Sequence, residues 1–124
     1  MNRRPQAVDL LAIGLGGALG ALMRWGAGQA TPNADGFPWT TFAINVVGCL
    51  LLALLPRVVT TGRAALFLGP GLLGSFTTMS AASEEGRALL ADGDLVIALA
   101  YLTATLLAAV LAVALATPRR RLER

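Results

Sequence analysis

Four long runs of the sequence carry no charged residue, and they constrain the fold more than any other feature. The longest, Leu95–Thr117, holds only Tyr101 and a few threonines as polar side chains. At about 1.5 Å per residue, a helix of roughly 20 residues crosses an apolar layer about 30 Å thick. Leu10–Met23 is shorter, so its helix is expected to continue through Arg24 toward Ala30. We therefore expect an all-α membrane protein whose four transmembrane helices span about residues 8–30, 37–56, 64–85 and 95–117.

The composition supports a membrane protein and argues against catalytic and Cys/His metal sites. The chain has 124 residues, 56% of them hydrophobic and 14% charged, and its mean hydropathy is +0.68. This length allows a single domain, residues 1–124, with no room for a nucleotide-binding fold. There is no histidine or lysine, and the one cysteine, Cys49, lies in an apolar run. We therefore expect neither an enzyme nor a Cys/His metal site.

The arginines predict the orientation of the chain in the membrane rather than a nucleic-acid partner. Four spans place both termini on one side, and only Arg24 and Arg87 fall on the opposite side. The terminal side carries eight arginines: Arg3, Arg4, Arg57, Arg63, Arg119, Arg120, Arg121 and Arg124. The positive-inside rule then predicts cytoplasmic termini, in the inner (plasma) membrane of the cell.

The third apolar run contains helix breakers where a membrane helix would normally be regular. Within Gly69–Glu85, Pro70 lacks a backbone donor and several glycines weaken a helix further. We expect the third helix to be broken near Gly74–Thr78. Irregular backbone at bilayer depth persists only where protein or a water-filled cavity receives its polar groups, and such broken helices often form ion sites.

Polar side chains recur in the last three spans. Thr41 and Asn45 share a helix face in the second span, and Tyr101 and Thr105 do so in the fourth. Around the predicted break lie further hydroxyls: Ser75, Thr77, Thr78, Ser80 and Ser83. A lone hydroxyl in a membrane helix commonly bonds its own helix. Asn45 is harder to satisfy, so it is predicted either to act in function or to hold helices together.

The polar groups inside the spans are donors, which favours an anion. All seven acidic residues lie at the ends of spans or in loops, whereas a cation path or proton relay needs embedded carboxylates. Arg24 lies at the membrane edge, either as part of the site or as a snorkelling anchor. A small multidrug exporter is a less favoured alternative, because it needs an acid inside the first span. One four-span bundle cannot easily enclose a wet path, so we expect a dimer.

Three segments, in order, resemble motifs of the small fluoride channels called Fluc or CrcB, and together they cover nearly the whole chain. Gly16–Trp25 resembles the family's glycine-rich opening segment, which ends in arginine and an aromatic residue. Thr41–Gly48 resembles its Thr-x-x-x-Asn-x-x-Gly segment. Gly74–Ser80 resembles the broken-helix signature, with Ser83 and Glu85 in family positions.

The resemblance implies an antiparallel dimer that passes fluoride passively and lowers its toxicity in the cytoplasm. It implies a structural sodium ion at the dimer centre, held by carbonyls of Gly74 and Thr77. Arg24 resembles an arginine near the pore mouth, and Glu85 is expected to have an electrostatic or structural role. The partners implied are fluoride, lipid and a second four-span subunit. The residues expected to line the anion path are Asn45, Thr41, Met79, Ser80, Tyr101 and Thr105.

Two departures from the family pattern bear on the dimer. Met79 and Ala82 stand where the family usually has phenylalanines whose ring edges line the path. The strong arginine asymmetry also favours one orientation, and a single orientation cannot build an antiparallel homodimer. We therefore hypothesise a heterodimer with an oppositely oriented paralogue. A homodimer that tolerates methionine and a non-conducting structural subunit remain alternatives.

Overall fold

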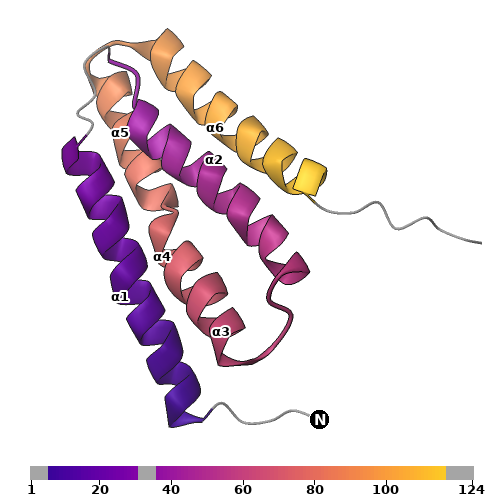
Figure 1. Cartoon of the computed structure of the whole chain (residues 1–124). Coiled ribbons are helices and arrows are strands. Elements are labelled where there is room, and N and C mark those ends of the chain that lie inside the picture. Colours follow the sequence, from indigo (N-terminus) through magenta and orange to yellow (C-terminus); the bar gives the residue numbers. More distant parts are fainter. Residues whose placement is uncertain (1–5, 31–35, 117–124) are drawn as a thin grey trace, which may run out of the picture.

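The protein is a bundle of four helical spans, as the computed structural model shows for residues 6–30 and 36–116 (Figure 1). Each span is long and apolar enough to cross a membrane: Ala7–Ala30, Trp39–Arg57, Gly62–Ala91 and Leu95–Ala116. The expected all-α, four-span architecture is therefore confirmed. The third span continues to Ala91, six residues beyond its expected end near residue 85. The terminal arginines of the orientation argument, at 3, 4, 119–121 and 124, lie outside the described residues.

The first two spans are regular helices with apolar sequences. Helix α1 runs over Ala7–Ala30 and α2 over Trp39–Leu54. Helix α2 begins directly after Pro38, whose fixed φ of −76° suits a helix start. It ends in one 3₁₀ turn, η1 (Leu55–Arg57), which contains the next proline.

The third span changes its helix type before it breaks. Helix α3 (Gly62–Leu66) leads into a π-helical segment, η2 (Phe67–Leu73), and then into α4 (Gly74–Phe76). Pro70 lies inside η2, where it cannot donate and its ring crowds the carbonyl of the preceding turn. The wider π-helix relieves this crowding. The proline and its neighbouring glycines thus give a π-helix, and the break itself follows later.

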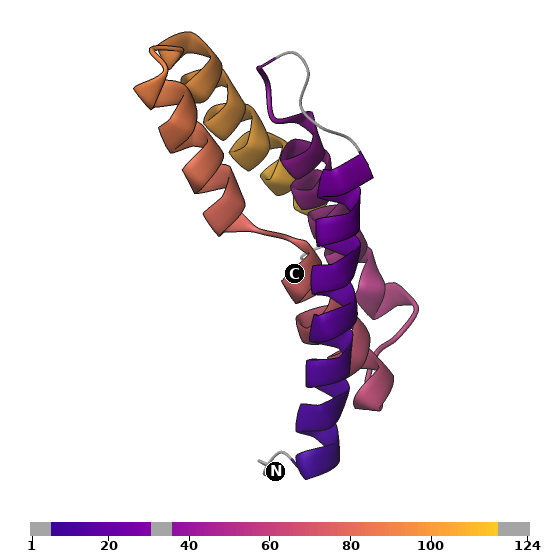
Figure 2. The ribbon, with the colours of Figure 1, turned by 90° about the vertical axis from the view of Figure 1, so that its left-hand side faces the viewer.

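Beyond the break, the chain continues as α5 (Met79–Ala91) and then α6 (Leu95–Ala116). Helix α1 packs on α3, η2 and α4, whereas α6 packs on α2 and α5. Figure 2 shows α5 and α6 side by side, leaning away from α1 above the break. The bundle therefore consists of two packed groups that meet where the third span is interrupted.

Two glycines allow α1 to approach the third span closely. A Cβ on Gly16 would collide with the carbonyl oxygen of Phe67, and one on Gly20 would collide with that of Leu72. Both glycines are buried, on the face that meets η2 and α4. Gly16 and Gly20, four residues apart, therefore form a small-residue packing motif of the kind common between membrane helices.

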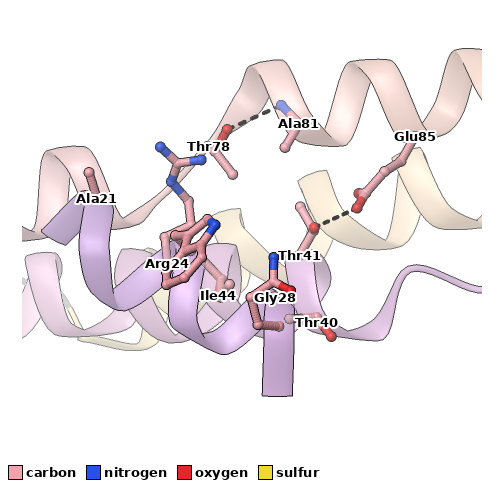
Figure 3. A pocket seen from close by; sticks show the side chains of 11 residues that line it. Ala21, Arg24, Gly28, Thr40, Thr41, Ile44, Thr78, Ala81 and Glu85 are labelled. Atoms are coloured by element: carbon pink, nitrogen blue, oxygen red, sulfur yellow. Dashed lines mark hydrogen bonds between the residues drawn. The ribbon is translucent and has the colours of Figure 1, made fainter. Parts of the chain in front are cut away.

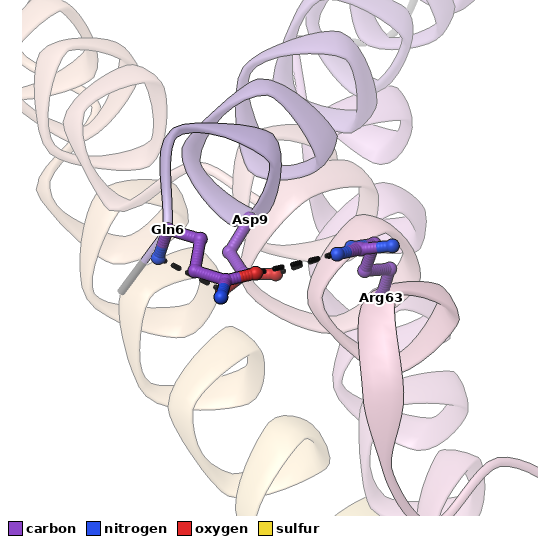
Figure 4. A network of polar contacts seen from close by, with 3 residues as sticks. All are labelled: Gln6, Asp9 and Arg63. Atoms are coloured by element: carbon purple, nitrogen blue, oxygen red, sulfur yellow. Dashed lines mark hydrogen bonds and ion pairs between the residues drawn. The ribbon is translucent and has the colours of Figure 1, made fainter. Parts of the chain in front are cut away.

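Two arginines at the connection between the second and third spans contact the start of the first helix and the end of the last. Arg63 Nε lies 3.4 Å from Asp9 Oδ1 at the start of α1, beside Gln6 (Figure 4). Arg57 donates through Nη2 to the backbone oxygen of Ala116 at the end of α6. The start of α1 and the end of α6 therefore lie on the same side of the bundle, as expected for four spans.

Candidate functional site

The third span is interrupted at two threonines, and a side chain from another helix holds them. Thr77 (φ −71°, ψ 153°) and Thr78 (φ −150°, ψ 115°) have extended backbone between α4 and α5. The buried amide of Asn45 in α2 accepts a hydrogen bond from Thr78 N at 2.7 Å. The same amide donates through Nδ2 to Thr78 O at 2.9 Å. Asn45 therefore pairs with both backbone groups of one residue, as a neighbouring strand would.

Other side chains satisfy the helix ends at the break. Thr78 Oγ1 accepts from Ala81 N at 3.1 Å, which caps the start of α5. Thr78 Oγ1 also lies 3.2 Å from Ser80 Oγ. Thr77 donates through both N and Oγ1 to Leu73 O, each at 3.1 Å. Of the hydroxyls expected around the break, those of Thr77 and Thr78 therefore bond the backbone beside it, and that of Ser80 lies against Thr78.

Arg24 of α1 contacts the third span just before its break. Its Nε donates to Ser75 O at 3.2 Å, and the side chain is partly buried. A guanidinium is favourable there because the C-terminal end of a helical segment carries partial negative charge. Of the two expectations for Arg24, the one that places it at the site fits this geometry.

Glu85 joins three helices. Its Oε1 accepts from Thr41 Oγ1 of α2 at 2.8 Å, and its Oε2 accepts from Tyr101 OH of α6 at 2.6 Å. Tyr101 is fully buried, and its ring packs edge-to-face with that of Phe37, with centroids 5.3 Å apart. Thr105 Oγ1 instead bonds Tyr101 O at 2.7 Å, within its own helix. Glu85 is therefore the centre of the polar contacts among α2, α5 and α6.

Two cavities flank the break. The larger, of about 460 Å³, lies among α1, α2 and α5 and includes Arg24, Thr41, Thr78 and Glu85 in its lining. Figure 3 shows Arg24 entering from α1 at one end and Glu85 from α5 at the other. This arrangement gives the cavity both a cationic and a carboxyl wall.

The smaller cavity, of about 180 Å³, lies beside α6. The predicted path residues that line it are Asn45, Met79 and Thr105, together with Thr77. Thr78, whose backbone Asn45 holds, lines both cavities. Most of the predicted path residues thus gather around one interruption, on its two sides.

The remaining predicted residues lie outside these cavities. Ser80 is exposed beside Thr78, and Tyr101 lies behind Glu85 in the core. Gly74 is exposed on the surface of the chain, and a Cβ there would meet only Gly69 O, at an ordinary 3.6 Å. Packing within the chain therefore does not require glycine at position 74.

The two positions that depart from the family pattern have different surroundings. Met79 is 68% exposed and lines the smaller cavity. Ala82 is 1% exposed and belongs to a core cluster with Leu89, Ala98 and Tyr101. Only Met79 therefore faces open space in this chain, while Ala82 is packed among its own helices.

Sequence reasoning placed Thr78 in the hydroxyl cluster at the break but not among the expected path or sodium-site residues, although it lines both cavities and caps α5. The sequence does indicate its capping role, because a threonine directly before a helical stretch is a common N-cap. The pairing of Asn45 with Thr78 had no such signal, since the two residues are 33 positions apart. Long-range pairs of this kind become visible only in the structure.

Comparison with known proteins places the chain in a family. A family model described as CrcB-like protein, Camphor Resistance (CrcB), matches residues 11–117. Fluoride-specific ion channel FluC 1 of Streptomyces coelicolor is 46% identical over 119 residues, covering 91% of this chain and 77% of that protein. FluC 2 of Nocardia farcinica is 46% identical over 118 residues, covering 90% and 84%. FluC of Thermus thermophilus is 43% identical over 97 residues, covering 73% and 78%. The chain therefore belongs to the CrcB family, the Fluc family that its motifs resemble.

Proposed function

We propose that this multi-pass membrane protein is a fluoride-selective passive channel that lets fluoride leave the cytoplasm and so lowers its toxicity. The observation that carries the proposal is the broken third span, with two cavities at the break that share Thr78 in their lining. The relatives named fluoride-specific ion channels support the choice of ion. The termini are cytoplasmic in this proposal, as the arginine distribution favours.

The chemistry around the break suits a small anion. Helix α5 begins at Met79, and the first N–H groups of a helix have no partner within it and lie at its positive end. The Asn45 amide and the Ser80 hydroxyl lie beside this helix start. Fluoride is small and strongly hydrated, so its path must replace water with donors of this kind. Arg24 provides a positive charge in the larger cavity.

A second four-span subunit, antiparallel to this one, completes the path in our proposal. Gly74, Met79 and Ser80 are exposed although they surround the break, which is where a partner would cover them. The arginine asymmetry and Met79 favour a paralogue of opposite orientation, because Met79 offers no electropositive ring edge. The chain is thus one half of a heterodimer in this proposal.

A structural sodium ion fits the oxygens available at the break. Among residues 6–30 and 36–116 there is no cluster of three or more His, Cys, Asp or Glu, so side-chain ligands of that kind are not offered there. The carbonyl oxygens of Gly74 and Thr77 are hard ligands, and one such pair from each subunit of the dimer would supply four. Sodium bound there would hold the two broken helices together at the centre of the dimer.

Replacing Gly74 by alanine tests the sodium site. The methyl group fits within the chain, so we expect the helices to remain folded by circular dichroism. We also expect the sodium concentration for half-maximal thermal stabilisation of the assembled protein to rise about tenfold, as for other perturbed metal sites. Gly28→Ala, at another exposed glycine with open space, is the matched control. Equal sodium dependence in the two variants would contradict the site.

Fluoride efflux from liposomes tests the channel and its partner. With sodium present, we expect the purified chain alone to release no fluoride, and the chain assembled with an oppositely oriented paralogue to release fluoride but not chloride. We expect Asn45→Leu to reduce efflux along this chain's path by roughly 100-fold, since a lost ion contact of about 2–3 kcal/mol raises the barrier. Rapid efflux from the chain alone would overturn the heterodimer in favour of a homodimer.

The second candidate function is a non-conducting structural subunit of the same dimer. The observation that favours it is Met79, which is exposed where the family usually has an aromatic ring. In that case Asn45→Leu would leave the efflux of the assembled dimer unchanged. No efflux under any of these conditions would show that the chain shares only the fold of its family.

A further inference from the structure

The break diverts two backbone donors from the carbonyls that would receive them in a continuous helix. In an α-helix, Thr78 N would donate to Gly74 O, and Ala81 N would donate to Thr77 O. Here Thr78 N donates to Asn45 Oδ1 at 2.7 Å, and Ala81 N donates to Thr78 Oγ1 at 3.1 Å. The side chains of Asn45 and Thr78 thus accept the N–H donors that Gly74 O and Thr77 O would receive in a continuous helix.

The carbonyl groups on each side of Gly74 O do accept hydrogen bonds. Leu73 O receives both donors of Thr77, and Ser75 O receives the guanidinium of Arg24. Of these consecutive carbonyl groups, the one at Gly74 is deprived of its helical donor while those on each side receive a partner. A carbonyl without its donor is costly at bilayer depth unless something else binds it.

The diverted carbonyls belong to the two residues of the proposed sodium site. We infer that Asn45 and the Thr78 hydroxyl are positioning residues for this cation, because they remove the competing N–H donors from Gly74 O and Thr77 O. The inference rests on the proposed sodium site. Without Asn45, Thr78 N is free to close the helix onto Gly74 O, and the oxygen is lost to the cation.

The same geometry links the cation to the anion cavities. Asn45 lines the smaller cavity, and Thr78, whose backbone it holds, lines both cavities. The Asn45 side chain that diverts Thr78 N from Gly74 O therefore also holds a residue that lines both cavities. In this inference, occupancy of the cation site and the shape of the anion path both depend on the two hydrogen bonds between Asn45 and Thr78.

Sodium titration of thermal unfolding tests this role without measuring transport. The assembled protein is unfolded in detergent over a range of sodium concentrations, with choline replacing sodium at constant ionic strength. Asn45→Leu and Thr78→Val remove the two acceptors, and we expect each to raise the half-maximal sodium concentration about tenfold or more. Thr78→Ser keeps the accepting hydroxyl and should restore the original value. Thr105→Val is the control, because its hydroxyl bonds only its own helix.

The outcomes separate this inference from the proposal on which it rests. If the unmodified protein is no more stable in sodium than in choline, the sodium site itself is wrong. If sodium stabilises the unmodified protein and the Asn45 and Thr78 variants keep its half-maximal concentration, only the positioning role is overturned. Should Asn45→Leu fail to fold, the comparison of Thr78→Val with Thr78→Ser still decides the matter.

Discussion

Replacing Gly20 by alanine will destabilise the protein by about 3 kcal/mol or more, an unusually large effect for one added methyl group. The Cβ would collide with the carbonyl oxygen of Leu72, which is backbone and cannot rotate away as a side chain would. Helix α1 would have to move off the π-helical segment along its length. Thermal unfolding in detergent measures the loss.

Gly14→Ala provides the matched comparison on the same helix. Nothing lies within 4 Å of a Cβ at Gly14, so alanine is accommodated and its helix propensity is up to about 1 kcal/mol better than that of glycine. We expect the Gly14 variant to unfold at the original temperature or above it. Equal losses at Gly14 and Gly20 would show that the contact with Leu72 does not determine how α1 packs.

Replacing Glu85 by alanine will lower stability by about 2–3 kcal/mol and abolish fluoride efflux from the assembled dimer. The change removes the acceptor of the Tyr101 hydroxyl, which is buried, and that of Thr41. A buried donor left without its acceptor costs about 1–3 kcal/mol. Efflux is lost because α2, α5 and α6 lose the group that joins them beside the larger cavity.

The neighbouring glutamate and a double variant serve as controls. Glu84 is exposed and pairs with Arg87 on the same helix, so Glu84→Ala should leave both stability and efflux nearly unchanged. Tyr101→Phe, added to Glu85→Ala, should restore part of the lost stability, because it removes the stranded hydroxyl. Additive losses in the double variant would mean that Glu85 and Tyr101 are not energetically coupled.

Most of the fold could be predicted because it depends on properties that residues carry by themselves. Uncharged runs of suitable length specify the four spans, and Leu95–Ala116 shows this most plainly. Pro70 and its neighbouring glycines mark a disturbed third helix, although the segment around the proline is a π-helix and the interruption comes at Thr77 and Thr78. Propensity indicates that a helix is perturbed, but the partner that holds the open backbone determines where it opens.

The site was predicted less completely because its contacts join distant segments. Asn45 was recognised as difficult to bury, yet its partner, the backbone of Thr78, could not be read from the sequence. Glu85 was expected at the end of a span, and its placement between Thr41 and Tyr101 follows from how three helices pack. Residue type thus identifies which groups need partners, and the fold supplies the partners.

The pairing of spans has a consequence for biosynthesis. Helix α1 packs mainly on the third span, and α2 packs on the fourth, so consecutive spans do not form the main contacts of the bundle. When the first two spans enter the membrane, the buried face of α1 around Gly16 and Gly20 still lacks its partner. Helix α2 likewise lacks its main packing partner, α6, until the last span has been translated. Insertion of the first two spans therefore precedes most of the packing of the bundle, and a ribosome that stalls after the second span leaves two helices that make few contacts with each other.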